Sequence, residues 1–164
     1  MHRFLKIFLV IALAALTAVA LSGCGKSAES AESAASPVPS DASLSFSAAN
    51  LDSAVPAFWD GVWNGVPLQL LALSDGSGGV LLAYNTCQVC AGSPYAYFEL
   101  QDGALVCQNC GNAFPVSSIG ENAGGCNPMP VEQYRLENGQ VILEKAELDR
   151  AAQAFAHWKE GLPE

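Results

Sequence analysis

The alternation of apolar and polar positions in the middle of the chain predicts antiparallel strands. Val66 to Leu73 is an apolar-rich run with the composition of a strand, and the SDGSGG stretch from Ser74 to Gly79 is typical of a turn. Val80 to Tyr84 predicts the returning strand, which leads the chain to Cys87. We therefore expect a hairpin whose second strand ends next to a cysteine.

The pattern further along predicts a second hairpin. The apolar stretch from Tyr95 to Phe98 is joined through an Asp102-Gly103 turn to Ala104 to Val106, which leads directly into Cys107. A second cysteine pair thus also lies at the end of a predicted strand.

The C-terminal part predicts a long loop, a short strand and a helix. Residues 111–130 contain many Gly and Pro residues, which predict a loop without regular structure. A strand is expected from Gln140 to Leu143 and a helix from Ala146 to Glu160. The helix carries an apolar stripe for packing on a core: Leu148, Ala151, Ala152, Phe155 and Trp158. Residues 44–164 are therefore expected to form one small α+β domain, mostly antiparallel, with a C-terminal helix.

The first 23 residues have the pattern of a bacterial secretion signal. Arg3 and Lys6 precede an uncharged apolar run of 15 residues, Ile7 to Leu21, which is too short to span a bilayer comfortably. The run ends in Leu-Ser-Gly before Cys24, which resembles the lipobox of bacterial lipoproteins. We expect residues 1–23 to be a lipoprotein signal peptide and Cys24 to be lipidated. An ordinary secretion signal or a short membrane anchor is the alternative.

A tether is expected between this anchor and the folded part. Residues 24–43 are rich in Ser, Ala, Glu and Pro and contain no aromatic residue, which is typical of a disordered segment. The domain would then be held at the extracytoplasmic face of the cell membrane, with membrane lipid bound through Cys24. No other segment of the sequence predicts a membrane span.

The charge of the chain is strongly acidic. Removal of the signal peptide takes away two of the seven basic residues and none of the sixteen acidic ones, which leaves a formal net charge of -11. This charge argues against a nucleic-acid partner or an anionic lipid surface.

Beyond the lipobox cysteine, five cysteines remain, and four of them form two pairs. Cys87 and Cys90 are followed, after sixteen residues, by Cys107 and Cys110, a spacing typical of a tetrathiolate metal site. Two residues between cysteines allow the backbone to curl into a zinc-ribbon-like knuckle, and Gly111 favours that turn. Zinc, a single iron ion and an iron-sulfur cluster all accept four thiolates, so the spacing leaves the metal open.

Cys126 lies in the sequence GGCNPMP, where two glycines allow close packing of the backbone. It is either a fifth cysteine near the metal site, a replacement ligand or a capping thiol, or it is a small buried residue. The odd number of thiols argues against a purely structural disulfide framework. A thiol-disulfide oxidoreductase would use one Cys-x2-Cys pair at a helix N-terminus, whereas both pairs here follow strands. We expect His157 to be a surface or half-buried residue and not a metal ligand.

The blocks YNTCQVC, GALVCQNCGNAFPVSSIG and GGCNPMP, in this order and spacing, resemble the FtrD-like membrane iron-sulfur domain family, formerly a domain of unknown function. The resemblance extends over roughly Val62 to Phe155. It implies an iron-sulfur or related thiolate-metal protein linked to membrane redox or ferrous-iron uptake. Position by position, it assigns the family's cysteines to Cys87, Cys90, Cys107, Cys110 and, as the fifth, Cys126. Many relatives join the domain to several transmembrane helices, and here a lipid anchor and a tether stand in their place.

Taken together, these features favour a non-enzymatic metal-binding or electron-transfer protein. The expected cofactor is an iron-sulfur cluster or mononuclear iron, with zinc as the alternative, and the expected partner is a membrane redox or iron-permease protein. The sequence has no Ser/His/Asp set and no phosphate loop, which argues against a hydrolase or transferase. A structural zinc-ribbon module that binds a protein partner and a Cys-x2-Cys thiol-disulfide oxidoreductase are the alternative functions.

Overall fold

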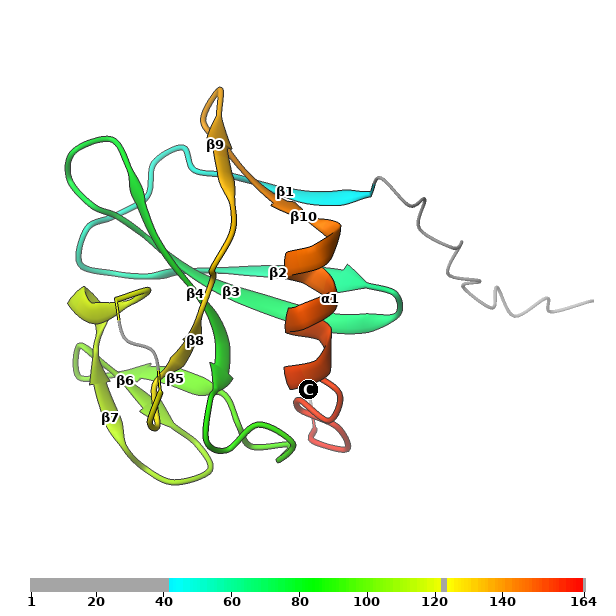
Figure 1. Ribbon diagram of the computed structural model, residues 1–164. Helices are drawn as coiled ribbons and strands as arrows, with labels where there is room; N and C mark the ends of the chain where they lie inside the picture. Colours follow the sequence, from blue (N-terminus) through cyan, green and yellow to red (C-terminus); the bar gives the residue numbers. More distant parts are fainter. Residues whose placement is uncertain (1–41, 122–123, 164) are drawn as a thin grey trace, which may run out of the picture. The chain divides into compact units, whose positions relative to one another are not determined.

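The computed structural model describes residues 42–121 and 124–163. The expected signal peptide, the lipidation site Cys24 and nearly all of the expected tether therefore lie outside the described residues. The strands form three antiparallel sheets, and the helix α1 (Lys145–Ala154) follows the last strand (Figure 1). This architecture confirms the predicted α+β fold of mostly antiparallel strands with a C-terminal helix.

The central sheet has four strands in the order β2-β3-β4-β8. They are β2 (Ala57–Trp63), β3 (Val66–Ser74), β4 (Val80–Cys87) and β8 (Pro128–Pro130). The pair β3 and β4 is the first predicted hairpin. Proline is tolerated in β8 because this strand lies at the edge of the sheet, where one side of the backbone needs no partner.

Two smaller sheets of three strands each complete the fold. One has the order β1-β10-β9 and consists of β1 (Ser43–Ser47), β10 (Gln140–Glu144) and β9 (Arg135–Glu137). The other has the order β5-β6-β7 and consists of β5 (Phe98–Gln101), β6 (Ala104–Cys107) and β7 (Ala113–Pro115). Asp102 and Gly103 form the predicted turn between β5 and β6, with φ of 50° and 80°. Positive φ at both positions matches the twist of a two-residue hairpin.

Strand β3 is buried on both faces, so its side chains belong to two cores. Leu70 and Ala72 face one core, whereas Leu71 and Leu73 face the other, as the alternation of a strand requires. The first core lies between the central sheet, β10 and α1, and its largest members are Trp63, Leu68, Leu70, Tyr84, Val141, Leu143, Leu148, Phe155 and Trp158. The second core lies between the central sheet and β5–β7, and its members are Leu71, Leu73, Ala83, Cys87, Phe98, Leu105, Cys107, Phe114 and Ile119. Among the described residues, the buried cysteines belong to the second core.

The described part of residues 111–130 contains more regular structure than the sequence predicted. Strand β7 pairs with β6, a 3-10 turn spans Val116–Ser118, and β8 pairs with β4. Phe114 and Ile119 from this stretch are buried in the second core. The prediction of a structureless loop was wrong, because short edge strands that contain proline give no alternating apolar pattern.

The helix is shorter than predicted, because it ends at Ala154 and not at Glu160. Beyond it the chain tightens into turns, and the Trp158 N–H donates to the Phe155 carbonyl at 3.0 Å. Both aromatic side chains nevertheless pack in the first core, which is why the apolar stripe extends beyond the helix. His157 lies exposed at the surface, as predicted, with its Nδ1 2.7 Å from a carboxylate oxygen of Glu160.

Gly120 offers a test of the packing around β4. Its φ of +79° lies in the left-handed region, and a Cβ at this position would lie 2.7 Å from the carbonyl oxygen of Leu82. Gly120→Ala is expected to lower the free energy of unfolding by more than about 2 kcal/mol, because backbone atoms of β4 block the added methyl group. Gly139→Ala is the matched control, since Gly139 has φ of +72° and no atom within 4 Å of the added Cβ. It should lose about 1 kcal/mol. Equal losses in urea unfolding would contradict the steric argument.

Candidate metal centre

The two predicted Cys-x2-Cys pairs meet at one point of the structure. The Sγ atoms of Cys87, Cys90, Cys107 and Cys110 all lie within 4.8 Å of one another. Cys87 is the last residue of β4 and Cys107 is the last residue of β6, so each pair follows a strand as the sequence predicted. The two hairpins thus deliver four thiols to one place.

Backbone hydrogen bonds close the turn at each pair. The Gly111 N–H donates to the Cys107 carbonyl at 2.8 Å, and the Ser93 N–H donates to the Cys90 carbonyl at 3.0 Å. Gly111 has φ of +73°, a conformation that a residue with a side chain rarely adopts. The glycine after the second pair therefore allows the chain to turn away from the sulfur atoms.

The four thiols differ in exposure. Cys87 and Cys107 are buried, Cys90 is half-buried, and Cys110 is exposed. Protein therefore shields the group on one side, whereas the Cys110 edge meets solvent. Protein would exclude water from most of the surroundings of a metal held here, and solvent would reach the metal at the Cys110 edge.

Backbone amides donate to two of the sulfur atoms. Burial raises the pKa of the Cys87 thiol well above its usual range, although the amides of Cys90 and Val89 donate to its sulfur and oppose that shift. Burial likewise raises the pKa of Cys90. The Asn112 amide donates to Cys110 and lowers the pKa of that exposed thiol. The amides are placed to stabilise thiolates, which are the form that binds a metal.

This difference predicts an order of reactivity in the metal-free chain, with Cys110 alkylated by iodoacetamide before Cys87. The thiolate is the nucleophile, and the lowered pKa gives Cys110 more thiolate at neutral pH, whereas Cys87 stays protonated and buried. Raising the pH should increase labelling of Cys87 long after labelling of Cys110 has reached its maximum rate. Peptide mass spectrometry over a series of pH values measures both rates. In denaturant the two rates should converge, and faster labelling of Cys87 in the folded chain would contradict the prediction.

Asn85 joins the two hairpins beside these thiols, a role that the sequence pattern did not indicate. Asn85 is 1% exposed and lies two residues before Cys87. Its Oδ1 accepts the Phe98 N–H at 2.7 Å, and its Nδ2 donates to the Phe98 carbonyl at 3.1 Å and to Gln69 Oε1 at 2.7 Å. Phe98 in turn pairs with Cys107 in the β5–β6 hairpin. Asn85 thus fixes the strand that carries Cys87 against the hairpin that carries Cys107.

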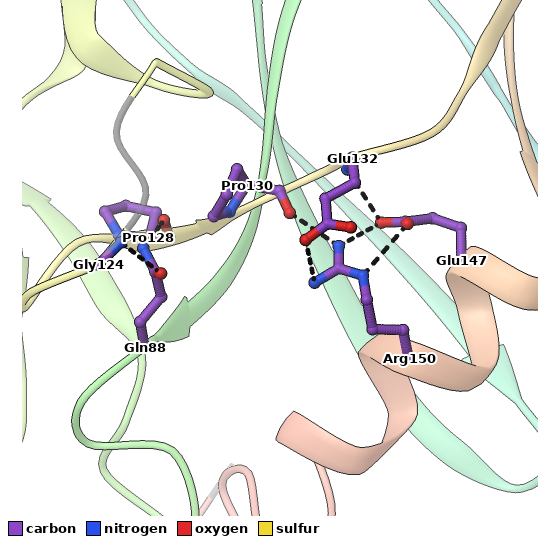
Figure 2. Close-up of polar contacts among 7 residues, drawn as sticks. All are labelled: Gln88, Gly124, Pro128, Pro130, Glu132, Glu147 and Arg150. Atoms are coloured by element: carbon purple, nitrogen blue, oxygen red, sulfur yellow. Dashed lines mark hydrogen bonds and ion pairs between the residues drawn. The ribbon is translucent and has the colours of Figure 1, made fainter.

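Cys126 lies beside the four-cysteine group, in a loop that Gln88 holds in place. Gln88 accepts the Gly124 N–H at Oε1 (2.7 Å) and donates from Nε2 to the Pro128 carbonyl (3.3 Å) (Figure 2). Cys126 is half-buried, and its thiol lies near that of Cys110 and helps to lower the pKa of Cys110, as the thiols of Cys107 and Cys90 also do. Across residues 42–121 and 124–163, the group of mutually close sulfur atoms consists of the two pairs, and Cys126 is not a member. The structure therefore places the fifth cysteine next to the group and not within it.

A second polar cluster, also drawn in Figure 2, ties α1 to the segment after β8. Glu147 on α1 is 4% exposed, and its Oε1 lies 2.5 Å from Nη2 of Arg150. The same carboxylate accepts the Glu132 N–H at 3.3 Å, and Arg150 donates to the Pro130 carbonyl at 2.9 Å. A buried carboxylate requires such partners. This cluster therefore explains how the buried carboxylate of Glu147 on α1 is accommodated.

The four sulfur atoms fit one tetrahedrally coordinated ion. A metal-thiolate bond of about 2.3 Å sets the edge of the tetrahedron at about 3.8 Å. Because all four Sγ atoms already lie within 4.8 Å of one another, small movements would bring them to that distance. Thiolates are soft ligands that favour zinc and iron over magnesium or calcium.

Fold and site together define a class of protein: a small, mostly antiparallel β domain with two cysteine knuckles whose thiols are arranged to hold a metal. A family model described as membrane iron-sulfur containing protein FtrD-like matches residues 57–155. This match covers more than half of the chain and includes the two cysteine pairs and Cys126, so the chain belongs to the FtrD-like family. No curated protein and no solved structure matches it.

The description of the family associates its members with membranes. In the part of the chain that the structure describes, no helix is both long and apolar enough to cross a bilayer. Anchoring through a lipid at Cys24 lies outside the described residues and stays a prediction.

Proposed function

We propose that this chain is a lipid-anchored protein of the extracytoplasmic membrane face that binds iron through Cys87, Cys90, Cys107 and Cys110. Its role is to carry single electrons or handle iron for a membrane redox or ferrous-iron uptake system. The observation that carries the proposal is the convergence of four thiols in a chain of an iron-sulfur family. When bound, iron with thiolate ligands supplies a one-electron couple.

The protein environment suits that role. Burial of Cys87 and Cys107 keeps water from most of the site, and the amides of Val89 and Asn112 donate to sulfur, which favours the more reduced metal. Cys110 is exposed and gives a short route from the site to a partner at the surface. The partner would be a membrane redox or iron-permease protein and not a nucleic acid, since the chain is acidic.

A second candidate function is a structural zinc module that presents a binding surface to a protein. The burial of Cys87 and Cys107 within the second core favours it, because a metal at this place also holds the hairpins together. Val89, between the cysteines of the first pair, is 64% exposed and belongs to the surface that such a module would present. Zinc and iron would use the same four residues, so the metal decides between the two functions.

The test is metal analysis, a visible spectrum and a redox titration of the full chain purified without oxygen. We expect iron, thiolate-to-iron charge-transfer absorption and a reversible one-electron couple. A colourless zinc protein without a couple would reject electron transfer in favour of the structural module. Thiol-disulfide exchange activity that survives removal of the metal would instead support the oxidoreductase.

Membrane attachment needs its own test. If Cys24 carries the lipid, Cys24→Ser should move the chain from the membrane fraction to the soluble fraction while the metal content stays the same. A variant chain that remains in the membrane fraction would support an uncleaved membrane anchor.

A further inference from the structure

The geometry points to a centre of one metal ion held by Cys87, Cys90, Cys107 and Cys110, without bridging sulfide, and with Cys126 outside as an unligated thiol beside Cys110. This inference rests on the proposed metal site and specifies the form of the metal. It differs from what the words iron-sulfur in the family description suggest at first reading, namely a cluster of several irons.

The separation of the sulfur atoms carries the first step of the argument. One ion bound to four thiolates at about 2.3 Å places the ligands about 3.8 Å apart. In a [4Fe-4S] cluster each thiolate binds a different iron, and in a [2Fe-2S] cluster two thiolates bind each iron, with sulfide between the irons. Either cluster holds some of its thiolates farther apart than a single ion does. The upper limit of 4.8 Å for every pair therefore fits one ion, whereas either cluster would require the sulfur atoms to move apart.

Hydrogen bonds between the hairpins oppose the opening that a cluster would need. The Cys87 N–H joins the end of β4 to the second hairpin by donating to the Ala96 carbonyl at 2.9 Å, and within that hairpin the Gln108 N–H donates to the Tyr97 carbonyl at 2.8 Å. The buried side chain of Asn85 adds two hydrogen bonds to the backbone of Phe98. To move one knuckle away from the other would break the buried bonds of Cys87 and Asn85, each of which is costly to lose.

The place of Cys126 agrees with a saturated four-ligand site. A structural tetrahedral ion takes four protein ligands and has no position for a fifth. The Cys126 thiol lies beside that of Cys110, the exposed member of the group, but outside the set of four mutually close sulfur atoms. Gln88 fixes the loop that presents it, through the Gly124 amide and the Pro128 carbonyl. Cys126 is therefore placed as a neighbour of a ligand and not as a fifth ligand.

Cobalt titration of the metal-free full chain tests this assignment without depending on iron or on redox activity. Tetrahedral cobalt bound by four thiolates gives intense visible bands, which should saturate at one cobalt per chain. Cys110→Ser and Cys126→Ser form a matched pair, because the two thiols are neighbours and neither is fully buried. Cys126→Ser should keep the single equivalence point and the tetrahedral bands, with at most about a 10- to 100-fold loss of affinity. Cys110→Ser should change the bands, because it removes one of the four thiolate ligands, and should lower the affinity more than Cys126→Ser does.

The iron form supplies the second readout. Protein purified without oxygen should contain one iron and no acid-labile sulfide. Several irons with matching sulfide, or loss of the cobalt bands in Cys126→Ser while circular dichroism shows a folded chain, would overturn the inference. A zinc protein with one ion per chain would reject the proposed electron transfer but uphold the single-ion site. A sulfide-containing protein with a reversible couple would reject the single-ion site but uphold the proposed electron transfer.

Discussion

Removal of the metal is expected to loosen the β5–β7 sheet while the first core stays folded. The second core contains Cys87 and Cys107 among a small set of buried residues, whereas the buried residues of the first core include no cysteine within the described ranges. The four thiols join the end of β4 to the end of β6, so a metal crosslinks these two strands. When the free metal concentration is about 1,000 times the dissociation constant, binding stabilises the folded state by about 4 kcal/mol. The loss of that stabilisation should fall on the part of the fold that the metal holds.

Hydrogen exchange followed by mass spectrometry measures this effect segment by segment. Amides of residues 96–112 should exchange up to roughly a thousand times faster after chelation, since about 4 kcal/mol corresponds to that factor. Amides of β3, which pairs on both sides within the central sheet, should change by less than about tenfold. The metal-loaded chain in the same buffer is the control.

The result would discriminate between a local and a global role of the metal. If exchange accelerates equally in β3 and in residues 96–112, the metal supports the whole domain, as it does in small zinc fingers. If exchange changes nowhere, the second core holds the hairpins together without a metal. The same experiment on Cys126→Ser should match the native chain, since Cys126 lies beside the group and not in it.

The local features of this site are readable in the sequence because they depend on short spacings. Two residues between cysteines produce a turn, and the Asp102-Gly103 pair produces a hairpin of fixed length. Once Cys87 and Cys107 each follow a strand, little freedom remains for the four thiols. The α+β fold and the convergence of the two cysteine pairs are therefore predictable from the sequence alone.

The remaining features depend on contacts between distant segments, which leave no periodic signal. Asn85 is a polar residue in a mostly apolar strand, and its role becomes clear only from its hydrogen bonds to the backbone of Phe98. The sequence likewise gives no sign that Gln88 holds the Gly124 loop and so positions Cys126. The helix end was missed for a related reason, because Phe155 is buried in the first core although it lies beyond the last helical residue.

Asn85→Ala is expected to lower both stability and metal affinity. The substitution leaves the N–H and the carbonyl of Phe98 without their buried side-chain partner, which costs about 2–4 kcal/mol for the two groups. Asn85→Asp keeps an acceptor for the Phe98 N–H, but it loses the donor to the Phe98 carbonyl and to Gln69 and buries a carboxylate beside these two oxygens, so it should destabilise the fold at least as much as Asn85→Ala. Gln101→Ala is the matched control, since Gln101 also carries a side-chain amide but is exposed at the far end of the β5–β6 hairpin. That control should lose less than about 1 kcal/mol.

Two measurements on the Asn85 variants separate stability from positioning. Urea unfolding of the metal-free chain reports the cost of the lost hydrogen bonds alone, because no metal is present. Cobalt affinity of the folded variant reports whether the two knuckles still meet, and an outer partner of this kind is worth about 10- to 100-fold in affinity. A variant that loses stability but binds cobalt as tightly as the native chain would show that the hairpins find their register without Asn85. A loss of both stability and cobalt affinity would mean that the buried amide of Asn85 aligns β4 with the β5–β6 hairpin. The cysteine spacing would then place the four thiols correctly only because Asn85 has already made this alignment.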